Sequence, residues 1–483
     1  MIKKLNKTTI NKQNRPINIL QFGEGNFLRA FVDWQLEIAN QEEIISAGVA
    51  ICQPILDKEH NVLKMIDLLN EQDQMYHVLL EGVQNGSPKR QIDLISSVMD
   101  AFNPYVDYDK YLSYITSKDL KIIISNTTEA GIRYVEGDSL TAEPPISFPA
   151  KMADFLYKRF QYFNGDPDSG LCVICCELIE DNGSTLHKYV IQHAEFNNLP
   201  SSFIAWVNNH CHFCDTLVDR IVSGFPKENI EDIKKEIGFD DNLVVKGEFY
   251  HLWVIGGEGY KEAQKLLPLD KAGLHVIFTP SIKEFRDKKV RILNGSHTGL
   301  VPIALQMGCE TVMDAFDTPI IESFIKEMME EEVLPMIDDD RESLNNFADE
   351  ILERFYNPYI NHKLESIALN SISKWEARNY PTVVDMWNKE GKLAKRELFT
   401  LAALLTLYSP NSGFVANDSV DAIIFIRDVW DSADLSTSIS KILNNSNIWI
   451  KDYSKIEGAI ETVTEYVMEI EKVGMEKAIN HKF

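Results

Sequence analysis

A short apolar run followed at once by two glycines most constrains what this chain can fold into. Ile17–Phe22 has the composition of a buried β-strand, and Gly23-Glu24-Gly25 leads directly into a helical pattern over Asn26–Ala39. Gly23 can form the tight turn, and Gly25 lets a pyrophosphate approach the backbone amides at the start of the helix. A strand, a glycine turn and a helix in this order predict a dinucleotide-binding unit.

The turn departs from the common Gly-x-Gly-x-x-Gly pattern at its third glycine. Leu28 occupies that position, so we expect the helix to lie farther from the strand than in the common fold. Arg29 is expected to add a cation beside the phosphates. The predicted cofactor contacts in this segment are Gln21, Phe22, Gly23, Glu24, Gly25, Asn26, Phe27, Leu28 and Arg29.

Short apolar runs alternate with helical stretches from residue 17 to about residue 180, which is typical of a parallel sheet with crossover helices. Asn126 and Thr127 directly follow the fourth predicted strand, at the edge where such sheets bind their ligand. These two residues either contact the nicotinamide ribose or cap the next turn. The predicted strands are Ile17–Phe22, Val49–Gln53, Ile92–Val98, Leu120–Ser125 and Leu171–Cys176.

The end of the second predicted strand does not settle which dinucleotide binds. A site for NAD usually has an acid there, which bonds the ribose hydroxyls. Here Gln53-Pro54 ends the strand, and the first acid is Asp57, with Lys58 beside it. NAD and NADP therefore both remain open from the residues alone.

The alternating pattern ends near residue 280. Residues 181 to 222 are predicted to be helical, and Glu248–Ile255 and His275–Thr279 to be strands. From residue 281 onward the apolar residues recur at helical spacing. We predict an α/β chain: a Rossmann-like doubly wound sheet over residues 1–280, then a mainly α-helical substrate and catalytic domain over 281–483. The active site is expected where the two meet. The predicted helices are 302–305, 319–331, 341–354, 393–407, 422–430 and 456–473.

Lys289, Asn294 and His297 have the spacing Lys-x4-Asn-x2-His, which suits a metal-free alcohol dehydrogenase. On an α-helix, at about 100° per residue, the three share one broad face, whereas Lys288 points away from His297. The lysine would take the proton from a carbinol, while the amide and imidazole stabilise the developing oxyanion. The alternative is a solvated basic start of a helix.

Charge and composition exclude several classes of protein. The formal net charge of −25 disfavours nucleic acid as a partner. No segment has the apolar length of a signal peptide or a membrane span, so we expect a cytoplasmic protein.

Seven cysteines suggest reduced thiols. Pairs at Cys172/Cys175 and Cys211/Cys214 have the spacing of zinc ligands. The first pair lies in a strand-like run, where residues three apart face opposite sides, and buried cysteines behave as small apolar residues, so we predict no metal site.

Six segments together resemble a known family. They are Gln21–Trp34, Ser125–Gly131, Cys176–Ile179, Leu217–Ile221, Lys289–His297 and Ile367–Ser371. The chain resembles the polyol-specific long-chain dehydrogenase/reductase family, whose members are similar to mannitol dehydrogenase. The resemblance covers nearly the whole chain, and its most specific part is the Lys289–His297 segment. It implies NAD as cofactor and places Asp219 near the active site, although alone Asp219 would belong to a surface ion pair.

Two departures from the mannitol-type pattern indicate an anionic substrate. Leu178 replaces an asparagine that helps to form the oxyanion hole, so Asn294 and His297 act alone or a residue such as Asn182 substitutes. Arg286 replaces a glutamate three residues before the lysine. A nearby cation favours a neutral lysine and suits a sugar acid.

The rest of the substrate pocket is expected from His362, Lys374 and Arg378. Lys374 and Arg378 are four residues apart on one helical face and could bind a carboxylate, although such a pair is often solvated. The resemblance implies reversible reduction of D-tagaturonate to D-altronate in hexuronate catabolism, by a monomer or small homo-oligomer. The alternatives are a reductase of fructuronate, a mannitol-type dehydrogenase, and a dinucleotide-binding sensor without catalysis.

Overall fold

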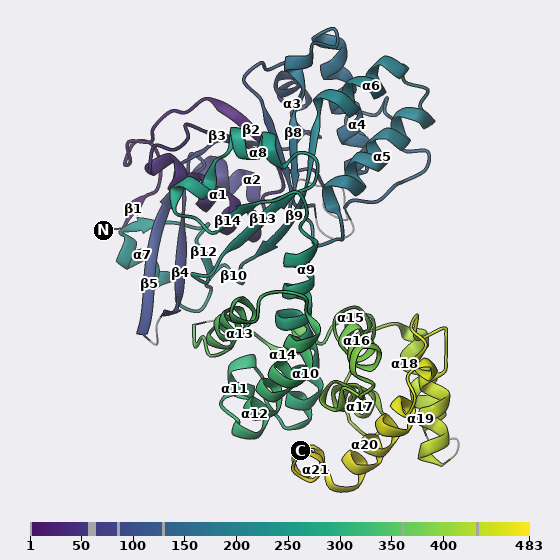
Figure 1. The fold of residues 1–483 in the computed structure, drawn as a ribbon. Helices are drawn as coiled ribbons and strands as arrows, with labels where there is room; N and C mark the ends of the chain where they lie inside the picture. Colours follow the sequence, from purple (N-terminus) through teal and green to yellow (C-terminus); the bar gives the residue numbers. More distant parts are fainter. Residues whose placement is uncertain (1, 57–63, 85–86, 128–130, 360–361, 431–433) are drawn as a thin grey trace. The chain divides into compact units, whose positions relative to one another are not determined.

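The computed structural model describes residues 2–56, 64–84, 87–127, 131–359, 362–430 and 434–483 (Figure 1). The chain divides into two compact units. The first consists of residues 1–81 and 88–282, and the second of residues 82–87 and 283–483. The predicted position of Asp57 and Lys58 near the nucleotide lies outside the described residues.

An eight-stranded sheet forms the centre of the first unit, and it confirms the predicted fold class. Six neighbouring strands, β6-β3-β2-β7-β8-β9, are parallel. Numbered along the chain, they have the order 3-2-1-4-5-6 of the doubly wound dinucleotide-binding fold. The strands, in sheet order, are β14 (Val276–Phe278), β13 (Leu252–Gly256), β9 (His212–Asp219), β8 (Cys172–Cys175), β7 (Ile122–Ser125), β2 (Ile17–Phe22), β3 (Gly48–Cys52) and β6 (Val98–Phe102).

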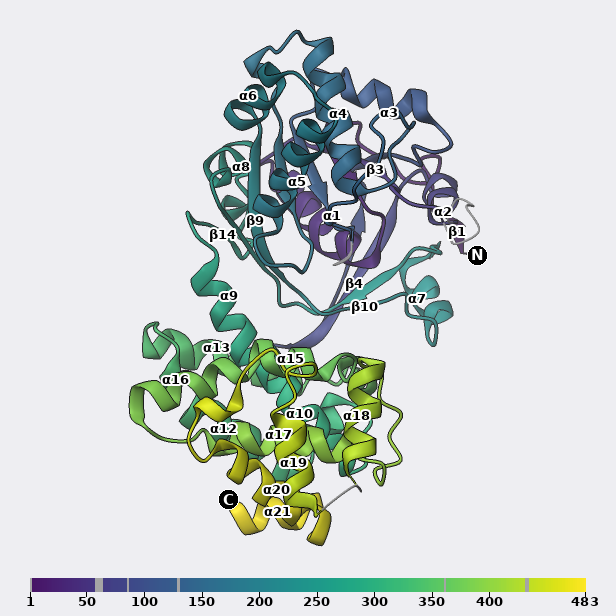
Figure 2. The same ribbon diagram turned by 90° about the vertical axis from the view of Figure 1, so that its right-hand side faces the viewer.

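Successive residues of the central strands pack on opposite faces of this sheet. Ile122 and Ile124 of β7 belong to one hydrophobic cluster with α1, whereas Ile123 belongs to a second cluster with α4, α5 and α6. Figures 1 and 2 show α4, α5 and α6 grouped together beside the sheet. The near-continuous apolar runs of these strands follow from burial on both faces. The helices of this unit are α1 (Asn26–Gln41), α2 (Met65–Glu71), α3 (Tyr108–Ile115), α4 (Phe148–Tyr162), α5 (Asn182–Phe196), α6 (Ser201–His210), α7 (Ile230–Ile237) and α8 (Tyr260–Leu266).

The prediction of a single strand over Ile92–Val98 is wrong, because one strand ends and another begins within this range. β5 ends at Ile95 and β6 begins at Val98, and they belong to different sheets. The Glu37 carboxylate accepts hydrogen bonds from the backbone amides of Ser96 and Ser97, at 2.8 and 2.7 Å, which interrupts the extended pairing. The smaller sheets contain β10 (Val222–Gly224), β12 (Val245–Gly247), β4 (Tyr76–Gln84) and β5 (Ser87–Ile95), and separately β1 (Lys3–Lys4) and β11 (Phe239–Asp240).

The prediction of helix throughout residues 181–222 is also wrong. α5 and α6 are helical, but His212–Asp219 is the sixth parallel strand, β9. The strand was not predicted because it contains polar residues. Two of them, Asp215 and Thr216, are buried and form hydrogen bonds with the start of α5. The strand β13, predicted from residue 248, begins only at Leu252 and pairs antiparallel with β9.

The second unit is helical, as predicted. Its centre is α17, nearly every residue of which is buried, and α10 and α20 pack against it in one hydrophobic cluster. The α-helices are α9 (Lys283–Lys289), α10 (Gly295–Gln306), α11 (Val312–Phe316), α12 (Pro319–Met328), α13 (Arg341–Phe355), α14 (Leu364–Ile367), α15 (Ser371–Arg378), α16 (Tyr380–Glu390), α17 (Lys395–Tyr408), α18 (Val420–Trp430), α19 (Leu435–Leu443), α20 (Ala459–Val473) and α21 (Met475–Lys482). Two π-helical segments, Val290–Asn294 and Met329–Val333, interrupt the series.

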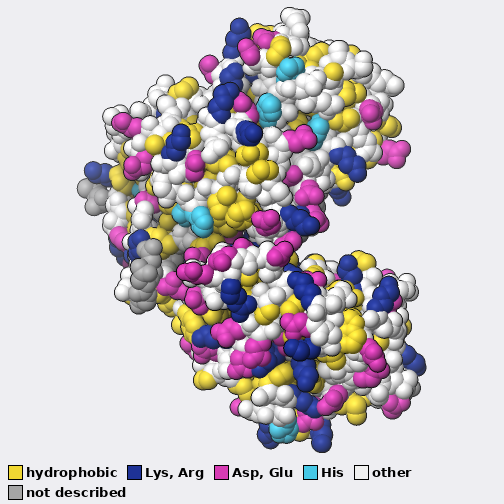
Figure 3. Space-filling model, in the orientation of Figure 1, with side chains coloured by type: hydrophobic (Ala, Val, Ile, Leu, Met, Phe, Trp, Pro, Cys, Tyr) yellow, Lys and Arg dark blue, Asp and Glu magenta, His cyan; other side chains and the backbone are white. Residues whose placement is uncertain are grey.

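Acidic side chains are spread over the face of each unit shown in Figure 3, in keeping with the net charge of −25. Among the described helices, none combines the length and the apolar composition that a membrane span requires.

Candidate active site

Gly23 begins the turn at the carboxyl end of β2, where the order of the strands reverses. Its φ of +124° is a conformation that side chains rarely permit. A Cβ there would lie 3.0 Å from the Asn126 carbonyl oxygen and 3.0 Å from Cδ1 of Leu28. Leu28 therefore packs into the space that Gly23 leaves, which is how this turn manages without its third glycine. The expectation that Leu28 would hold the helix away from the strand is not supported.

Gly25 precedes the first turn of α1 and faces open space. No described atom lies within 4 Å of the position that its Cβ would take, and no described side chain caps the amides of this helix at Gly25. Free amides at the start of a 16-residue helix favour an anion. The residues present thus fit the pyrophosphate of a dinucleotide at the carboxyl edge of the sheet.

We expect the two glycines to respond differently to replacement. Gly25→Val should weaken NADH binding about tenfold or more, because it obstructs hydrogen bonds to a charged group, and should leave folding intact. Gly23→Val should instead destabilise the fold by about 1–3 kcal/mol or more, since it forces a strained φ. Fluorescence titration with NADH and urea unfolding measure the two effects. Unchanged NADH affinity in Gly25→Val would contradict the backbone-approach model.

Arg29 stabilises the glycine turn through buried hydrogen bonds. Its side chain is only 2% exposed, and its guanidinium donates hydrogen bonds to the Leu243 carbonyl at 2.7 Å, to Asn26 Oδ1 at 2.7 Å and to the Glu24 carbonyl at 3.1 Å. Burial lowers the pKa of Arg29. Arg29 therefore holds Glu24 and Asn26 in place, and its position beside the phosphates stays a prediction.

The other predicted contacts in this segment have mostly buried or structural roles. Gln21 donates to the Gly23 carbonyl at 3.1 Å. Phe22 is buried against Phe148, and Phe27 stacks on Phe31. Glu24 accepts a hydrogen bond from Gln53, the residue that ends the second parallel strand, at 2.9 Å.

Thr127, just after β7, is held by Glu177, whose role sequence reasoning missed, and the Asn126 amide donates to the Phe22 carbonyl at 3.1 Å. Glu177 is 2% exposed and accepts hydrogen bonds from the Thr127 amide and hydroxyl, both at 2.9 Å, and from the Ser125 hydroxyl at 3.1 Å. Burial raises the pKa of Glu177. The Thr127 hydroxyl thus bonds Glu177, which fixes the loop beside Gly23.

In the second unit, Lys289, Asn294 and His297 lie along one helical run that is not uniformly α-helical. α9 ends at Lys289, Val290–Asn294 is a π-helix, and α10 begins at Gly295. The π segment has a wider turn, so the assumption of 100° per residue fails there. Short π segments are frequent at functional sites. Lys289 and His297 are buried and Asn294 is half-buried.

His297 is the most unusual of the three side chains. Its Nε2 is buried and has no hydrogen-bond partner among the described residues. Its ring centroid lies 4.5 Å from that of Phe355 and 5.1 Å from that of His362. Burial, and the positive charges of His362, Arg354 and Arg378, hold the pKa of His297 well below its usual value. The imidazole is therefore neutral at pH 7, with one polar atom free to bond a ligand.

Arg378 reaches this segment, whereas Lys374 does not. Nη1 of Arg378 donates to the Thr298 hydroxyl at 3.1 Å, and that hydroxyl donates to the Asn294 carbonyl at 2.8 Å. Lys374 Nζ donates to the Ile367 carbonyl at 3.0 Å. Arg354, a residue that sequence reasoning missed, is 8% exposed, and its charge lowers the pKa of both His297 and His362.

Two of the three cations expected near Lys289 are paired elsewhere. Lys288 donates to the Ser343 hydroxyl at 2.7 Å and lies 3.2 Å from Asp339. Arg291 forms an ion pair with Asp385 at 2.7 Å. Repulsion by Lys288 and Arg291 is therefore weaker than the sequence suggested, because both cations are neutralised or bonded by other groups.

Asn182 cannot replace the donor missing at Leu178. Its two amide hydrogens are used by the carbonyls of Glu177 and Thr216, at 2.9 and 3.2 Å, and its oxygen accepts from the Thr216 and Gly183 amides. Leu178 itself is 62% exposed. Asp219, at the end of β9, is 5% exposed, so the surface ion-pair interpretation is wrong.

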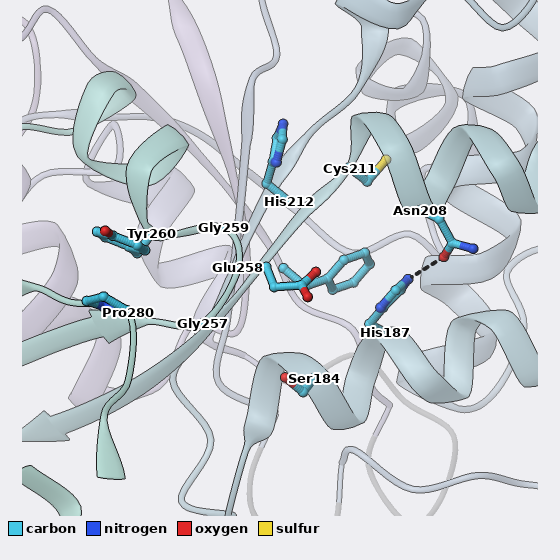
Figure 4. Close-up of a pocket in the computed structure, with 11 residues that line it drawn as sticks. Ser184, His187, Asn208, Cys211, His212, Gly257, Glu258, Gly259, Tyr260 and Pro280 are labelled. Carbon is cyan, nitrogen blue, oxygen red and sulfur yellow. Dashed lines mark hydrogen bonds between the residues drawn. The ribbon is translucent and has the colours of Figure 1, made fainter. Parts of the chain in front are cut away.

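A cavity of about 610 Å³ lies elsewhere in the first unit, beside the start of β9. Figure 4 shows His187, hydrogen-bonded to Asn208, and Glu258 among the side chains that line it. None of the predicted site residues lines this cavity.

The cysteines take part in no described metal cluster. Cys172 and Cys214 approach each other across β8 and β9, with sulfurs 3.9 Å apart. Among the described residues, no three His, Cys, Asp or Glu side chains are grouped to hold a metal ion. Six of the seven thiols are buried and Cys309 is partly exposed.

Comparison with known proteins identifies two family domains. Residues 17–268 match the mannitol dehydrogenase Rossmann domain, and residues 281–471 match the mannitol dehydrogenase C-terminal domain. The chain is 40% identical to an altronate oxidoreductase of Bacillus subtilis over 99% of this chain and 98% of that protein. It is 39% identical to an altronate oxidoreductase of Bacteroides thetaiotaomicron, over 98% of each chain.

Two solved structures have the same fold. The mannitol 2-dehydrogenase of Pseudomonas fluorescens, in ternary complex with NAD and D-mannitol, matches with a TM-score of 0.74 and 18% identity over 99% of both chains. A substrate-free D-sorbitol dehydrogenase matches with a TM-score of 0.80 and 20% identity, over 99% of this chain and 100% of that one.

Proposed function

This chain belongs to the mannitol dehydrogenase family, and we propose that it interconverts D-tagaturonate and D-altronate with NAD as the hydride carrier. One observation carries the choice of an anionic substrate. The buried Nε2 of His297 has no hydrogen-bond partner among the described residues, and the groups whose electrostatic influence lowers its pKa, His362, Arg354 and Arg378, are all basic. In a chain with a net charge of −25, such a gathering suits a carboxylate ligand. The names of the relatives at 39–40% identity support the same substrate.

The cofactor is proposed to bind over Gly23 and Gly25. The amides at the start of α1 would hold the pyrophosphate, and Asn126 and Thr127 at the end of β7 would lie near the nicotinamide ribose. The bound cofactor supplies the hydride acceptor and donor. The chain itself supplies position and proton transfer.

In the direction of oxidation, Lys289 is proposed to accept the proton of the altronate hydroxyl. Asn294 and His297 would donate hydrogen bonds to the same oxygen as its negative charge develops. A neutral His297 suits this role, because its Nε2 can carry the proton that it shares. In reduction, Lys289 returns the proton to the new alkoxide. The proposed reaction uses no metal ion.

The carboxylate of the substrate lies at the end remote from its carbonyl. Arg378 is the proposed partner for it, with His362 and Asp219 as further substrate contacts. Lys374 is proposed as a weaker substrate contact than Arg378, since its ammonium already donates a hydrogen bond to the Ile367 carbonyl. A sensor without catalysis would need the glycine turn alone, so the complete Lys-Asn-His set favours an enzyme.

A substrate panel tests the proposal directly. NADH oxidation is followed with D-tagaturonate, D-fructuronate and D-fructose at equal concentrations. We expect D-tagaturonate to give the highest kcat/KM. A higher value for D-fructuronate would reassign the substrate within the uronates, and a higher value for D-fructose would contradict the proposal of an anionic substrate. No turnover with any of them would favour the sensor.

NADH should be strongly preferred to NADPH. The residue that follows the second parallel strand is Gln53, which is buried and bonded to Glu24 and Asn103, so this position supplies no cation for a 2′-phosphate. Initial rates at subsaturating concentrations of each cofactor provide the measurement. Equal rates with both would refute the preference.

A further inference from the structure

A buried pair, Asn379 and Glu397, contacts the backbone between two proposed active-site residues. Asn379 lies between α15 and α16 and is 0% exposed. Its Nδ2 donates one hydrogen bond to the Gly295 carbonyl at 3.0 Å and another to Glu397 Oε2 at 2.8 Å. Gly295 follows Asn294 directly and precedes His297 by two residues. The amide therefore links the central helix α17 to the proposed catalytic segment.

The contact falls at the point where the helix changes type. The π segment ends at Asn294 and α10 begins at Gly295, so the direction of the following side chains depends on how this junction is held. The Cβ of a residue at position 295 would lie 3.6 Å from Asn379 Nδ2 and 3.5 Å from the Val290 carbonyl oxygen. These are ordinary van der Waals distances, so the side-chain amide packs closely against the junction.

Glu397 is itself firmly placed. Its backbone amide donates to Glu332 at 2.9 Å, and its carbonyl accepts a hydrogen bond from the Thr400 hydroxyl, which in turn accepts one from Trp375 Nε1 at 2.8 Å. Glu397 is 1% exposed. Burial raises the pKa of Glu397 to about 8, with the carboxylate of Glu332 acting in the same direction and Asn379 and Arg291 opposing it. The side chain is mostly neutral at pH 7.

Asn379 Oδ1 is buried and has no partner among the described residues. A neutral carboxyl, like an amide, offers both a donor and an acceptor, whereas an ionised carboxylate offers acceptors alone. Ionisation of Glu397 would leave a buried charge that desolvation opposes and that the hydrogen bond from Asn379 and the charge of Arg291 offset.

We propose that Asn379, held by Glu397, is a positioning residue that fixes Asn294 and His297 through the Gly295 carbonyl. The proposal rests on the function proposed above, because it assigns these residues to the same reaction. It assigns no contact with substrate or cofactor to either residue. Loss of the link should lower kcat while the nucleotide site, which belongs to the first unit, is unaffected.

The kinetic test compares variants of both residues. Asn379→Ala, Asn379→Ser and Glu397→Leu should each lower kcat for altronate oxidation about tenfold to a hundredfold, as expected when reacting groups are misplaced. NADH affinity should stay at the wild-type value and show that the first unit is folded. Glu397→Gln, which keeps a donor and an acceptor, should stay within about threefold of wild type. Normal kcat in both Asn379 variants, or equal losses in Glu397→Gln and Glu397→Leu, would overturn the proposal.

The pH profile separates positioning from simple stability. In the oxidation direction Lys289 is the base, so its contribution rises with pH. Ionisation of Glu397 should make kcat of the wild type fall above about pH 8, and Glu397→Gln should lack this fall. Glu332→Gln should instead move the fall to lower pH, because it removes a carboxylate that raises the pKa of Glu397. A fall that persists unchanged in Glu397→Gln would refute the proposal.

A second readout needs no enzymatic activity. Hydrogen exchange of the amides in residues 290–300 should be faster in Asn379→Ala and Glu397→Leu than in the wild type, and unchanged in Glu397→Gln. Unaltered exchange in all three variants would overturn the positioning role. If the wild-type protein shows no turnover, the proposed function is wrong, but the hydrogen-exchange result still tests the positioning role of Asn379.

Discussion

Replacing Lys289 by alanine should lower kcat for altronate oxidation by about a hundredfold or more, the usual contribution of general acid–base catalysis. The affinity for NADH should not change, because the glycine turn lies in the other unit. Steady-state kinetics and a fluorescence titration with NADH measure the two effects. A variant with near-normal turnover and pH dependence would contradict the assignment of Lys289 as the base.

Lys288→Ala is the matched control for this experiment. Lys288 has the same charge one residue earlier, but its amine bonds Ser343 and Asp339. We expect turnover within about threefold of wild type, since a surface ion pair contributes little. Loss of activity on treatment with a chelator would independently contradict a mechanism without metal.

Replacing Arg378 by alanine should lower kcat/KM for the keto-uronate by about a hundredfold while changing that for fructose little. A buried hydrogen-bonded charge pair with the carboxylate is lost only from the anionic substrate, and removal of one partner of such a pair typically costs about 2–5 kcal/mol. The neutral ketose has no carboxylate to leave unpaired. The ratio of the two specificity constants therefore measures the effect directly.

Arg341→Ala controls for the loss of a positive charge. Arg341 is an exposed arginine at the start of α13, and its guanidinium donates to the Glu330 carbonyl. Its replacement should leave the substrate preference as it is. If Arg378→Ala also preserved the preference, the carboxylate partner would have to be sought elsewhere, and Arg354, which lies near His297 and His362, would be the next residue to replace.

The sequence predicted the parts of the fold whose physical signals are local. A glycine at a positive φ after an apolar run marks the turn at Gly23, and burial on both faces makes the central strands plainly apolar. β9 was missed because Asp215, Thr216 and Asp219 give it a polar composition, although all three are buried. The hydrogen-bond partners of Asp215 and Thr216 in α5 are distant in sequence, so the local pattern did not indicate a strand.

Only part of the candidate site could be predicted from the sequence, for a similar reason. The spacing of Lys289, Asn294 and His297 is visible in the sequence, but the π segment between them is not. Glu177 and Glu397 look like ordinary polar residues at a strand end and in the first turn of a helix. Only the fold shows that they are buried and bonded to Thr127 and Asn379. Buried networks join residues that are far apart in sequence and leave no periodic signal.

The π segment at Val290–Asn294 also bears on how such a site could arise or be lost. A π turn closes i→i+5 hydrogen bonds where an α turn closes i→i+4, so it accommodates one extra residue within an otherwise continuous helix. Deletion of one residue within this segment removes the extra residue and returns the run to a regular α-helix, so the side chains after it largely keep their directions relative to Lys289. The same deletion within the regular part of α10 would rotate every later side chain by about 100°. The helix therefore absorbs the loss of a single codon more readily at the π segment than in α10.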